Sequence, residues 1–378
     1  MENIADMKKL RHLLHQNAEV SGKEIKTSTI IEDFLKKQNP DTLLTKQGGN
    51  AIIAIFNGMK PGFTTMIRAD MDAVKVSSSV VNDYSSLNKS VSHQCGHDGH
   101  SAILAGLASF LNKNRPVNGK IVLLFQPEEE TGNGAKRIIS KGVLNEIAPD
   151  FIFGYHNLPG FSENTIITKE GTFASASSGL AIELKGKNAH AANPESGISP
   201  VLAVMSLIDF FEKLNKKPSG FKDFILNTIT HVSIGKPVFG ISPGSAKMLV
   251  TLRSFSDTDM NLIIKKISNK ILELKVNHRL EIKTSLSDVF PALVNNSEAL
   301  AIVEQAARKM KIKIKRQNEP FRWSEDFAHY NNIAKTCYFG IGAGKDCPGL
   351  HQESYDFPDS IIPKSIEFLG ALCSGHFS

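Results

Sequence analysis

The stretch that organises this chain is Ser92-His93-Gln94-Cys95-Gly96-His97-Asp98-Gly99-His100. It holds three histidines, one cysteine, one aspartate and two glycines. Imidazole and thiolate are preferred ligands of zinc-like cations, and glycine permits the turns that bring neighbouring side chains together. A single histidine is usually a hydrogen-bonded structural residue, but this density predicts a metal site. The alternative is a polar loop whose histidines and cysteine share no role.

The composition is that of a globular protein with two domains. The chain has 378 residues, of which 41% are hydrophobic and 22% are charged, and this length predicts more than one core. The net charge of +6 comes from dispersed lysines, so we predict no nucleic-acid partner. No apolar run is long enough for a membrane span, so we predict no membrane partner. The four cysteines are scattered, which indicates a reducing, cytoplasmic location.

Polar side chains follow three apolar segments that have the pattern of buried strands. The segments and the residues after them are 64–68 with Asp70 and Asp72, 120–125 with Glu129 and Glu130, and 151–154 with His156. A largely apolar helix is predicted between the first two segments, and this strand–helix–strand order indicates an α/β layer. Open α/β sheets bind ligands at the carboxyl ends of their strands. We therefore expect these side chains to meet residues 92–100 at one rim of a sheet.

The pattern changes near residue 175, where apolar and polar residues begin to alternate. The expected elements are a strand at 178–186, a helix at 200–214, strands near 224–234 and 247–255, a helix at 258–276 and a strand at 280–284. This β-α-β-β-α-β order is ferredoxin-like, and α/β texture returns after it. We predict a discontinuous metal-binding catalytic domain over residues 1–174 and 287–378, with an inserted domain over 175–286.

These residues resemble the motifs of the M20 metallopeptidase family, specifically its aminoacylase-like amidohydrolase branch. That branch includes hippurate hydrolases, auxin–amino acid conjugate hydrolases and N-acetyldiaminopimelate deacetylases. The motifs occur in order over nearly the whole chain, at 68–73, 95–100, 125–130, 155–157, 186–194, 324–327 and 350–351. The resemblance implies a zinc-peptidase-like α/β catalytic domain with an inserted ferredoxin-like α+β lid domain. It also implies that the lid domain often forms a homodimer.

The resemblance further implies two divalent metal ions, with zinc favoured and manganese, cobalt or nickel as alternatives. The implied ligands are Cys95, His97, Glu130, His156 and His351. Two such ions can activate water and polarise a carbonyl group. The resemblance therefore implies a two-metal hydrolase site whose ligands come from four distant segments.

The resemblance assigns other roles around these ligands. Glu129 would be the general base that takes a proton from the attacking water and delivers it to the leaving amine. His190, on the lid, would stabilise the oxyanion. The aspartates Asp70, Asp72 and Asp98 would support the ligands from outside. Arg253, on a lid strand, either binds a substrate carboxylate or is a surface arginine, and His15 is either a site residue or a structural one.

The sequence departs from the branch at several positions. Gln94 stands where similar chains have alanine, which we interpret as a conservative change at a non-ligand. Glu128 adds a carboxylate beside the predicted base, and residues 74–77 differ where the specificity pocket is expected. Gly240 begins a lid segment from which a substrate-contacting asparagine is missing. No implied metal ligand is missing, so we do not favour an inactive relative.

The predicted function is that of a metal-dependent amidohydrolase. Its small-molecule substrates would be N-acyl amino acids, cleaved by water to a carboxylate and a free amino acid. One alternative is a dipeptidase or carboxypeptidase of the same fold. The other is a catalytically silent metal-binding relative, for which changing Glu129 would alter nothing.

Overall fold

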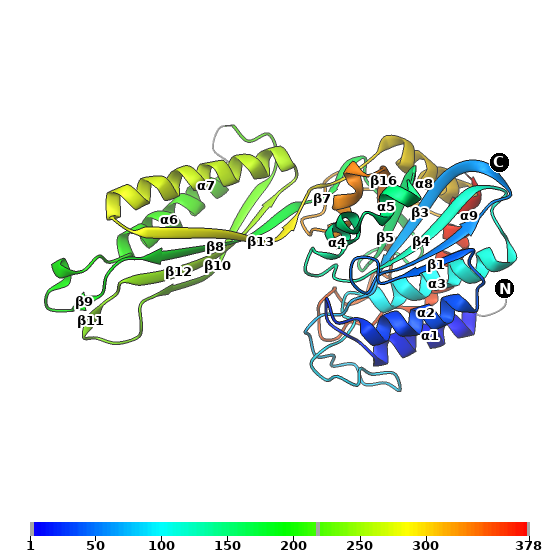
Figure 1. Ribbon diagram of the computed structural model, residues 1–378, viewed down its shortest axis with the longest axis horizontal. Helices are drawn as coiled ribbons and strands as arrows, with labels where there is room; N and C mark the ends of the chain where they lie inside the picture. Colours follow the sequence, from blue (N-terminus) through cyan, green and yellow to red (C-terminus); the bar gives the residue numbers. More distant parts are fainter. Residues whose placement is uncertain (1–3, 217–219, 376–378) are drawn as a thin grey trace. The chain divides into compact units, whose positions relative to one another are not determined.

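The computed structural model describes residues 4–216 and 220–375, and these residues form two compact units (Figure 1). Unit 1 takes its described residues from 1–173, 293–319 and 325–378, and unit 2 takes its residues from 174–292 and 320–324. The sequence placed the end of the insertion at 286, which lies inside a strand that continues to Phe290. Residues 320–324 also join unit 2, a return that no sequence pattern indicated.

Unit 1 is built on a mixed eight-stranded sheet with the order β1-β2-β4-β3-β5-β16-β6-β15. Its strands are β1 (Thr42–Thr45), β2 (Ile52–Asn57), β3 (Lys60–Asp70), β4 (Asn118–Gln126), β5 (Phe151–Leu158), β6 (Ile166–Thr168), β15 (Ile314–Arg316) and β16 (Lys335–Gly342). The four neighbouring strands β4, β3, β5 and β16 are parallel. Their carboxyl ends therefore lie along one rim of the sheet.

Helices cover the sheet of unit 1, and five of them share one hydrophobic core with it. They are α1 (Ile4–Gln16), α2 (Ile25–Lys36), α3 (His97–Lys113), α8 (Ser297–Lys309) and α9 (Ile362–Gly375). Helix α3 is buried along nearly its whole length, which explains why it is apolar almost all round. At Gly106 of α3, an added β-carbon would lie 2.2 Å from Ile366 of α9. Glycine there lets the two helices approach closely.

Shorter elements complete unit 1. They are α4 (Gly134–Lys141), α5 (Val143–Ile147), the 3₁₀ segments η2 (Asp326–Asn332) and η3 (Asp359–Ile361), and the paired strands β7 (Gly171–Ala174) and β14 (Leu293–Asn295). Helix α4 contacts η2. An added β-carbon on Gly154 of β5 would touch Phe327 of η2, so η2 lies directly on the sheet.

Unit 2 has a four-stranded antiparallel sheet with the order β10-β12-β8-β13. In chain order its elements are β8 (Ala176–Lys185), α6 (Val201–Asn215), β10 (Ile225–Ile234), β12 (Ser245–Ser254), α7 (Asp257–His278) and β13 (Glu281–Phe290). Along β8, Leu180, Ile182 and Leu184 point into a core that both helices share. This is the predicted ferredoxin-like connectivity. The predicted fold class, an α/β unit with a separate small antiparallel domain, is confirmed.

Two short features extend unit 2 beyond its main sheet. The strands β9 (Ala189–His190) and β11 (Ile241–Ser242) pair with each other, and the 3₁₀ segment η1 (Pro194–Ser196) follows β9. Across both units, no helix of the described residues combines the length and the apolar run that a membrane crossing needs.

Candidate metal centre and active site

The carboxyl ends of β4, β3 and β5 bring distant polar residues to the same rim. Strand β3 ends at Asp70 and lies between β4 and β5. Residues 92–100 reach this rim because α3 begins at His97 and Gly96 precedes it with φ +94°. An added β-carbon on Gly96 would lie 2.5 Å from Asn157 Oδ1. Glycine is therefore required both for the positive φ and for the close approach.

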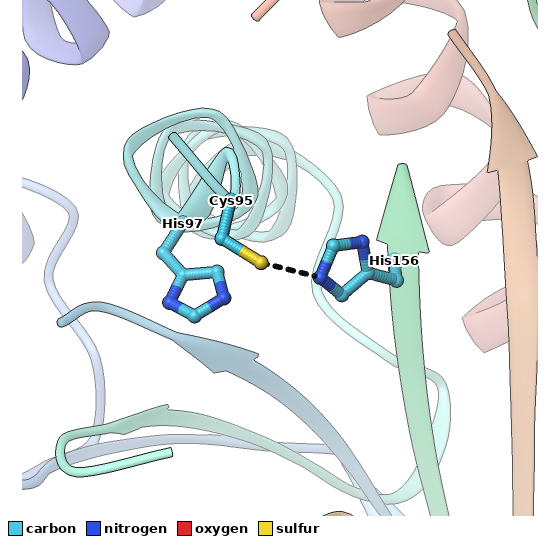
Figure 2. Close-up of side chains that lie close together, drawn as sticks. All are labelled: Cys95, His97 and His156. Carbon is cyan, nitrogen blue, oxygen red and sulfur yellow. Dashed lines mark hydrogen bonds between the residues drawn. The ribbon is translucent and has the colours of Figure 1, made fainter. Parts of the chain in front are cut away.

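Cys95, His97 and His156 form a first group of candidate ligands (Figure 2). One ligand atom from each lies within 4.8 Å of the others, and Cys95 Sγ is 3.4 Å from His156 Nε2. His156 Nδ1 is 2.8 Å from the carbonyl oxygen of Asn157, to which it donates. His97 Nδ1 is 3.1 Å from Asp72 Oδ1. Both Nδ1 atoms are thus engaged, and each ring places its Nε2 beside another candidate ligand, Cys95 for His156 and Glu130 for His97.

Glu130 and His351 form a second group, together with Cys95 again. His351 Nε2 lies 3.3 Å from Glu130 Oε1. Cys95 belongs to both groups, so its sulfur would be available to a cation held by either of them. The structure thus brings all five implied ligands together at one rim. Their coordination of metal ions stays a prediction.

The surroundings favour a positive charge at this point. His97 Nε2 and Glu130 Oε1 are buried and make no hydrogen bond among the described residues, although His351 lies within ion-pair distance of Glu130 Oε1. Burial by itself lowers the pKa of His97, but Asp70 and Asp72 outweigh it and raise that pKa to about 10. Burial and the nearby Glu130 raise the pKa of the Cys95 thiol. A divalent cation would take the place of both protons and satisfy the acidic surroundings, so the residues present fit a metal ion.

Asp72 contacts two of the candidate ligands. Beyond its bond with His97, its Oδ2 accepts hydrogen bonds from the Glu130 backbone N–H at 3.1 Å and from Ser21 Oγ at 2.6 Å. One carboxylate therefore orients both the imidazole of His97 and the backbone of Glu130, as a residue that supports a metal site would do.

Asp70 and Asp98 have different surroundings. Asp70 Oδ1 is 2.5 Å from His100 Nδ1, in the interior beside the site. Asp98 pairs with His15 Nδ1 at 2.8 Å and with Arg11 Nη1 at 3.3 Å, so it joins the start of α3 to α1. The contact with Asp98 gives His15 a structural role, one of the two alternatives that the sequence left open.

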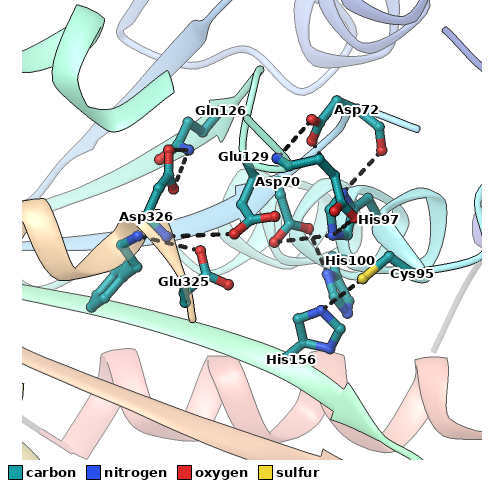
Figure 3. A network of polar contacts seen from close by, with 12 residues as sticks. Asp70, Asp72, Cys95, His97, His100, Gln126, Glu129, His156, Glu325 and Asp326 are labelled. Atoms are coloured by element: carbon teal, nitrogen blue, oxygen red, sulfur yellow. Dashed lines mark hydrogen bonds and ion pairs between the residues drawn. The ribbon is translucent and has the colours of Figure 1, made fainter. Parts of the chain in front are cut away.

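Glu129 lies in a buried network of charged residues (Figure 3). Its Oε1 accepts a hydrogen bond from the backbone N–H of Asp326 at 3.4 Å. Carboxylate oxygens of Glu129, Glu325 and Asp326 lie within 4.8 Å of one another. Burial, followed by repulsion from Glu325 and Glu130, raises the pKa of Glu129. A carboxylate with a raised pKa binds a proton more tightly than an exposed glutamate does, which suits a proton acceptor.

Arg68 is the cation that compensates this network. It is fully buried, and its guanidinium contacts Asp70 at 2.7 Å, Glu325 at 3.0 Å and Asp326 at 2.8 Å. The sequence motifs contained these four residues, but we assigned no partner to Arg68 and no role to Glu325 or Asp326. The sequence could have indicated this network, because Arg68 is a charged residue in an otherwise apolar strand. A buried charge of this kind requires a partner of opposite charge.

Two of the implied site residues belong to unit 2. His190 is exposed, and its Nδ1 accepts a hydrogen bond from the Ala192 backbone N–H at 3.1 Å. That bond leaves the proton of the neutral ring on Nε2, which makes Nε2 a donor. Arg253 Nη1 donates to Arg322 O at 2.7 Å and to Ser324 Oγ at 3.1 Å. The catalytic role of His190 and the substrate-binding role of Arg253 stay predictions.

Comparison with known proteins identifies the family to which this chain belongs. The pattern of peptidase family M20/M25/M40 matches residues 66–374. The chain is 27% identical over 369 residues to hippurate hydrolase from Campylobacter jejuni, with 97% of this chain and 95% of that protein covered. It is 29% identical over 374 residues to thermostable carboxypeptidase 2 from Saccharolobus solfataricus, with 96% and 92% covered.

A solved structure supports the fold. The chain is similar to a dinuclear metal-binding peptidase of the M20 family from Bacillus subtilis, with a TM-score of 0.84. The two are 24% identical, and the match covers 99% of this chain and 98% of that one. At this level of identity the likeness concerns the arrangement of helices and strands.

Proposed function

Because the chain belongs to peptidase family M20/M25/M40, whose members hydrolyse amide and peptide bonds, we propose that it removes the acyl group from N-acyl amino acids. The observation that carries this proposal is the pair of ligand groups that share Cys95, with the buried Glu129 beside them. The likeness to a hippurate hydrolase supports an N-acylated amino acid as substrate.

We propose that two divalent ions are held by Cys95, His97, Glu130, His156 and His351. Zinc is expected because thiolate and imidazole ligands suit it, whereas manganese, cobalt and nickel are the alternatives. When bound, the ions supply Lewis acidity toward the scissile carbonyl and the attacking water.

Glu129 carries out the proton transfers in this proposal. Its carboxylate takes a proton from water as the oxygen bonds to the carbonyl carbon. It returns that proton to the amide nitrogen as the carbon–nitrogen bond breaks, so the products are a carboxylate and a free amino acid. Burial and the neighbouring Glu325 raise the pKa of Glu129, which strengthens it as the proton acceptor in the first step. His190 would donate from Nε2 to the oxyanion, since Nδ1 already accepts from Ala192.

A substrate screen tests the proposal. The protein is stripped of metal with a chelator, reloaded with one defined metal at a time, and assayed with N-acetyl amino acids, N-benzoyl amino acids and dipeptides. We expect cleavage of the N-acyl compounds and no activity in the chelated sample. Cleavage of dipeptides alone would favour a peptidase, the alternative that the likeness to a carboxypeptidase supports. Full activity in chelator would exclude the two-metal mechanism.

The role of Glu129 is tested on the substrate that the screen identifies. We expect Glu129→Gln to lower kcat by about 10²–10⁴-fold, the usual contribution of a general base, while the metal content stays at two ions. The matched control is Glu128→Gln in the neighbouring position, where the side chain pairs with Arg137 at 2.7 Å. Unchanged turnover in Glu129→Gln would show that another group moves the proton.

We also propose a homodimer formed through unit 2, and a cytoplasmic location. Helix α6 supports the dimer, because its exposed face carries Leu202, Met205 and Ile208, of which 64%, 60% and 38% are accessible. Exposed apolar residues that line one face of a helix are typical of an interaction surface. Sedimentation of the wild type and of Met205→Glu measures the oligomeric state, and a monomeric wild type would contradict the dimer.

A further inference from the structure

His351 lies in an exposed turn of a segment that has no regular secondary structure. Residues 345–358 contain no helix or strand, and the side chains of residues 351–354 are exposed. His351 has φ +64°, a conformation that residues with a β-carbon seldom adopt. Leu350, Tyr355 and Phe357 pack into the core of unit 1 on either side of this turn, so hydrogen bonds to the backbone of residues 351–353 hold the exposed turn itself.

Gln94 makes most of those hydrogen bonds. Its backbone carbonyl accepts from the His351 N–H at 2.8 Å. Its side-chain Nε2 donates to Gln352 O at 3.0 Å and to Glu353 O at 2.9 Å. One buried residue, next in sequence to Cys95, thus holds three successive residues of the loop. A side-chain amide suits this position because a single nitrogen carries two donors.

Other hydrogen bonds to this loop come from residues 75–90, a segment without regular secondary structure. Ser79 N and Ser78 Oγ also donate to Glu353 O, at 2.8 Å and 3.4 Å. The position of Gln94 is fixed instead by complete burial. Its Oε1 is buried without a hydrogen-bond partner among the described residues, which costs free energy. The two bonds that Nε2 makes offset that cost.

We propose that Gln94 is a positioning residue that holds the His351 loop against the Cys95 turn and so completes the second metal-binding group. The proposal rests on the proposed function in one respect, because it takes His351 to be a metal ligand. Gln94 itself touches neither metal nor substrate in this role. The change from alanine to Gln94, interpreted from sequence as conservative, instead ties together two ligand-bearing segments whose contacting residues are 258 positions apart.

The experiment uses the full chain and compares wild type with Gln94→Ala, Gln94→Met and Ser78→Ala. Zinc binding to the chelated protein is measured by competition with a chromophoric chelator, and hydrogen exchange is measured for the peptide that contains residues 349–355 without metal. In Gln94→Ala and Gln94→Met we expect the weaker zinc equivalent to lose about 10–100-fold in affinity. We expect exchange at the His351 amide to become about 10-fold faster, for the loss of two hydrogen bonds.

The controls separate positioning from stability and volume. Methionine fills the space of glutamine without its donors, so wild-type behaviour of Gln94→Met would overturn the proposal. Equal loss of both zinc equivalents with a lowered Tm would also overturn it, because Gln94 would then be a structural residue. Ser78→Ala removes another side-chain donor to Glu353 O and should retain wild-type affinity. If wild type binds fewer than two zinc ions, the proposed function fails, and the exchange difference alone decides the role of Gln94.

Discussion

The two units bury different kinds of side chain. The interior of unit 1 contains many charged groups, namely Arg11, Glu24, Arg68, Asp70, Asp72, Asp98, Glu128, Glu129, Glu304, Glu325 and Asp326. Among the described residues of unit 2, Asp259 is the one charged side chain that is buried. It accepts hydrogen bonds from the backbone N–H groups of Lys222 and Asp223. The apolar core of unit 2 suits a scaffold, whereas the charged interior of unit 1 suits chemistry.

This difference has an energetic meaning. A buried ion pair is costly to desolvate, and replacing it with apolar residues is often neutral or stabilising. The network around Arg68 is therefore weak evidence for stability but strong evidence for a site that needs charges at fixed positions. The comparison predicts that changes in unit 1 affect metal binding and pH dependence, whereas changes in the core of unit 2 affect stability alone.

The largest effect is expected when Arg68 loses its charge. In Arg68→Met, three carboxylates, Asp70, Glu325 and Asp326, remain buried without their common cation. We expect a loss of about 4 kcal/mol in the free energy of unfolding of unit 1, measured by urea denaturation followed by far-UV circular dichroism. Arg115→Met is the control, because Arg115 pairs with Asp41 at the surface and should cost less than about 1 kcal/mol.

A core substitution in unit 2 comes next. Phe211 of α6 is fully buried, and Phe211→Ala should cost about 3 kcal/mol through the lost burial and the cavity left behind. Trp323, the single tryptophan of the sequence, belongs to unit 2, so its fluorescence follows the unfolding of that unit. Zinc affinity should stay at the wild-type value. A parallel loss of zinc affinity would remove the distinction between the two units.

The third prediction concerns Asp72. Asp72→Ala removes the carboxylate that accepts from His97 Nδ1 and from the Glu130 backbone N–H and leaves only the Asp72 backbone carbonyl, 3.0 Å from Nδ1. We therefore expect zinc affinity to fall by up to ~100-fold, equivalent to about 2.7 kcal/mol. Zinc competition measures this loss. Asp209→Ala on α6, where the carboxylate pairs with Lys213 at the surface, should leave zinc affinity unchanged. Wild-type affinity in Asp72→Ala would contradict a supporting role for this carboxylate.

The smallest effect is a pH dependence that originates at Glu24. Burial, together with Asp72, raises the pKa of Glu24 to about 7, above the unfolded value of about 4.3. Its contribution to stability is therefore fully present below pH 4 and is lost as the pH rises through 7. Glu24→Gln should reduce the fall in stability between pH 5 and 7 by roughly 2 kcal/mol, measured in chelator. Glu32→Gln, at an exposed pair with Lys36, should leave the slope unchanged.

The sequence predicted the features that local patterns carry. Alternation along β8 and apolar runs at β4 and β5 identified strands. Burial of one face of a strand makes apolar and polar residues alternate, and burial of both faces makes the run continuously apolar. Strand β1 was missed because it has four residues and no fully buried one. The helix predicted between β3 and β4 is present as α3, and it begins at His97, inside the polar stretch 92–100. The polar first turn concealed its start, because those side chains serve the site and its supports.

The candidate site was predictable where its residues are neighbours in sequence or match a motif. What could not be predicted is which groups pair across long separations. Asp98 was grouped with Asp70 and Asp72, yet it pairs with Arg11, which lies 87 residues away. Gln94 seemed unimportant because its partners are backbone carbonyls, which leave no residue type to recognise. Such contacts depend on the folded path of the chain rather than on local composition.

The order of segments along the chain has a consequence for synthesis. Strand β16 lies between β5 and β6 in the sheet, but it is made only after the whole of unit 2, and His351 follows it. Domains generally fold as they emerge from the ribosome, at about 5–20 residues per second. The ribosome therefore completes unit 2 while the sheet of unit 1 still lacks a central strand. His351 therefore joins the other four candidate ligands only after nearly the whole chain has been made.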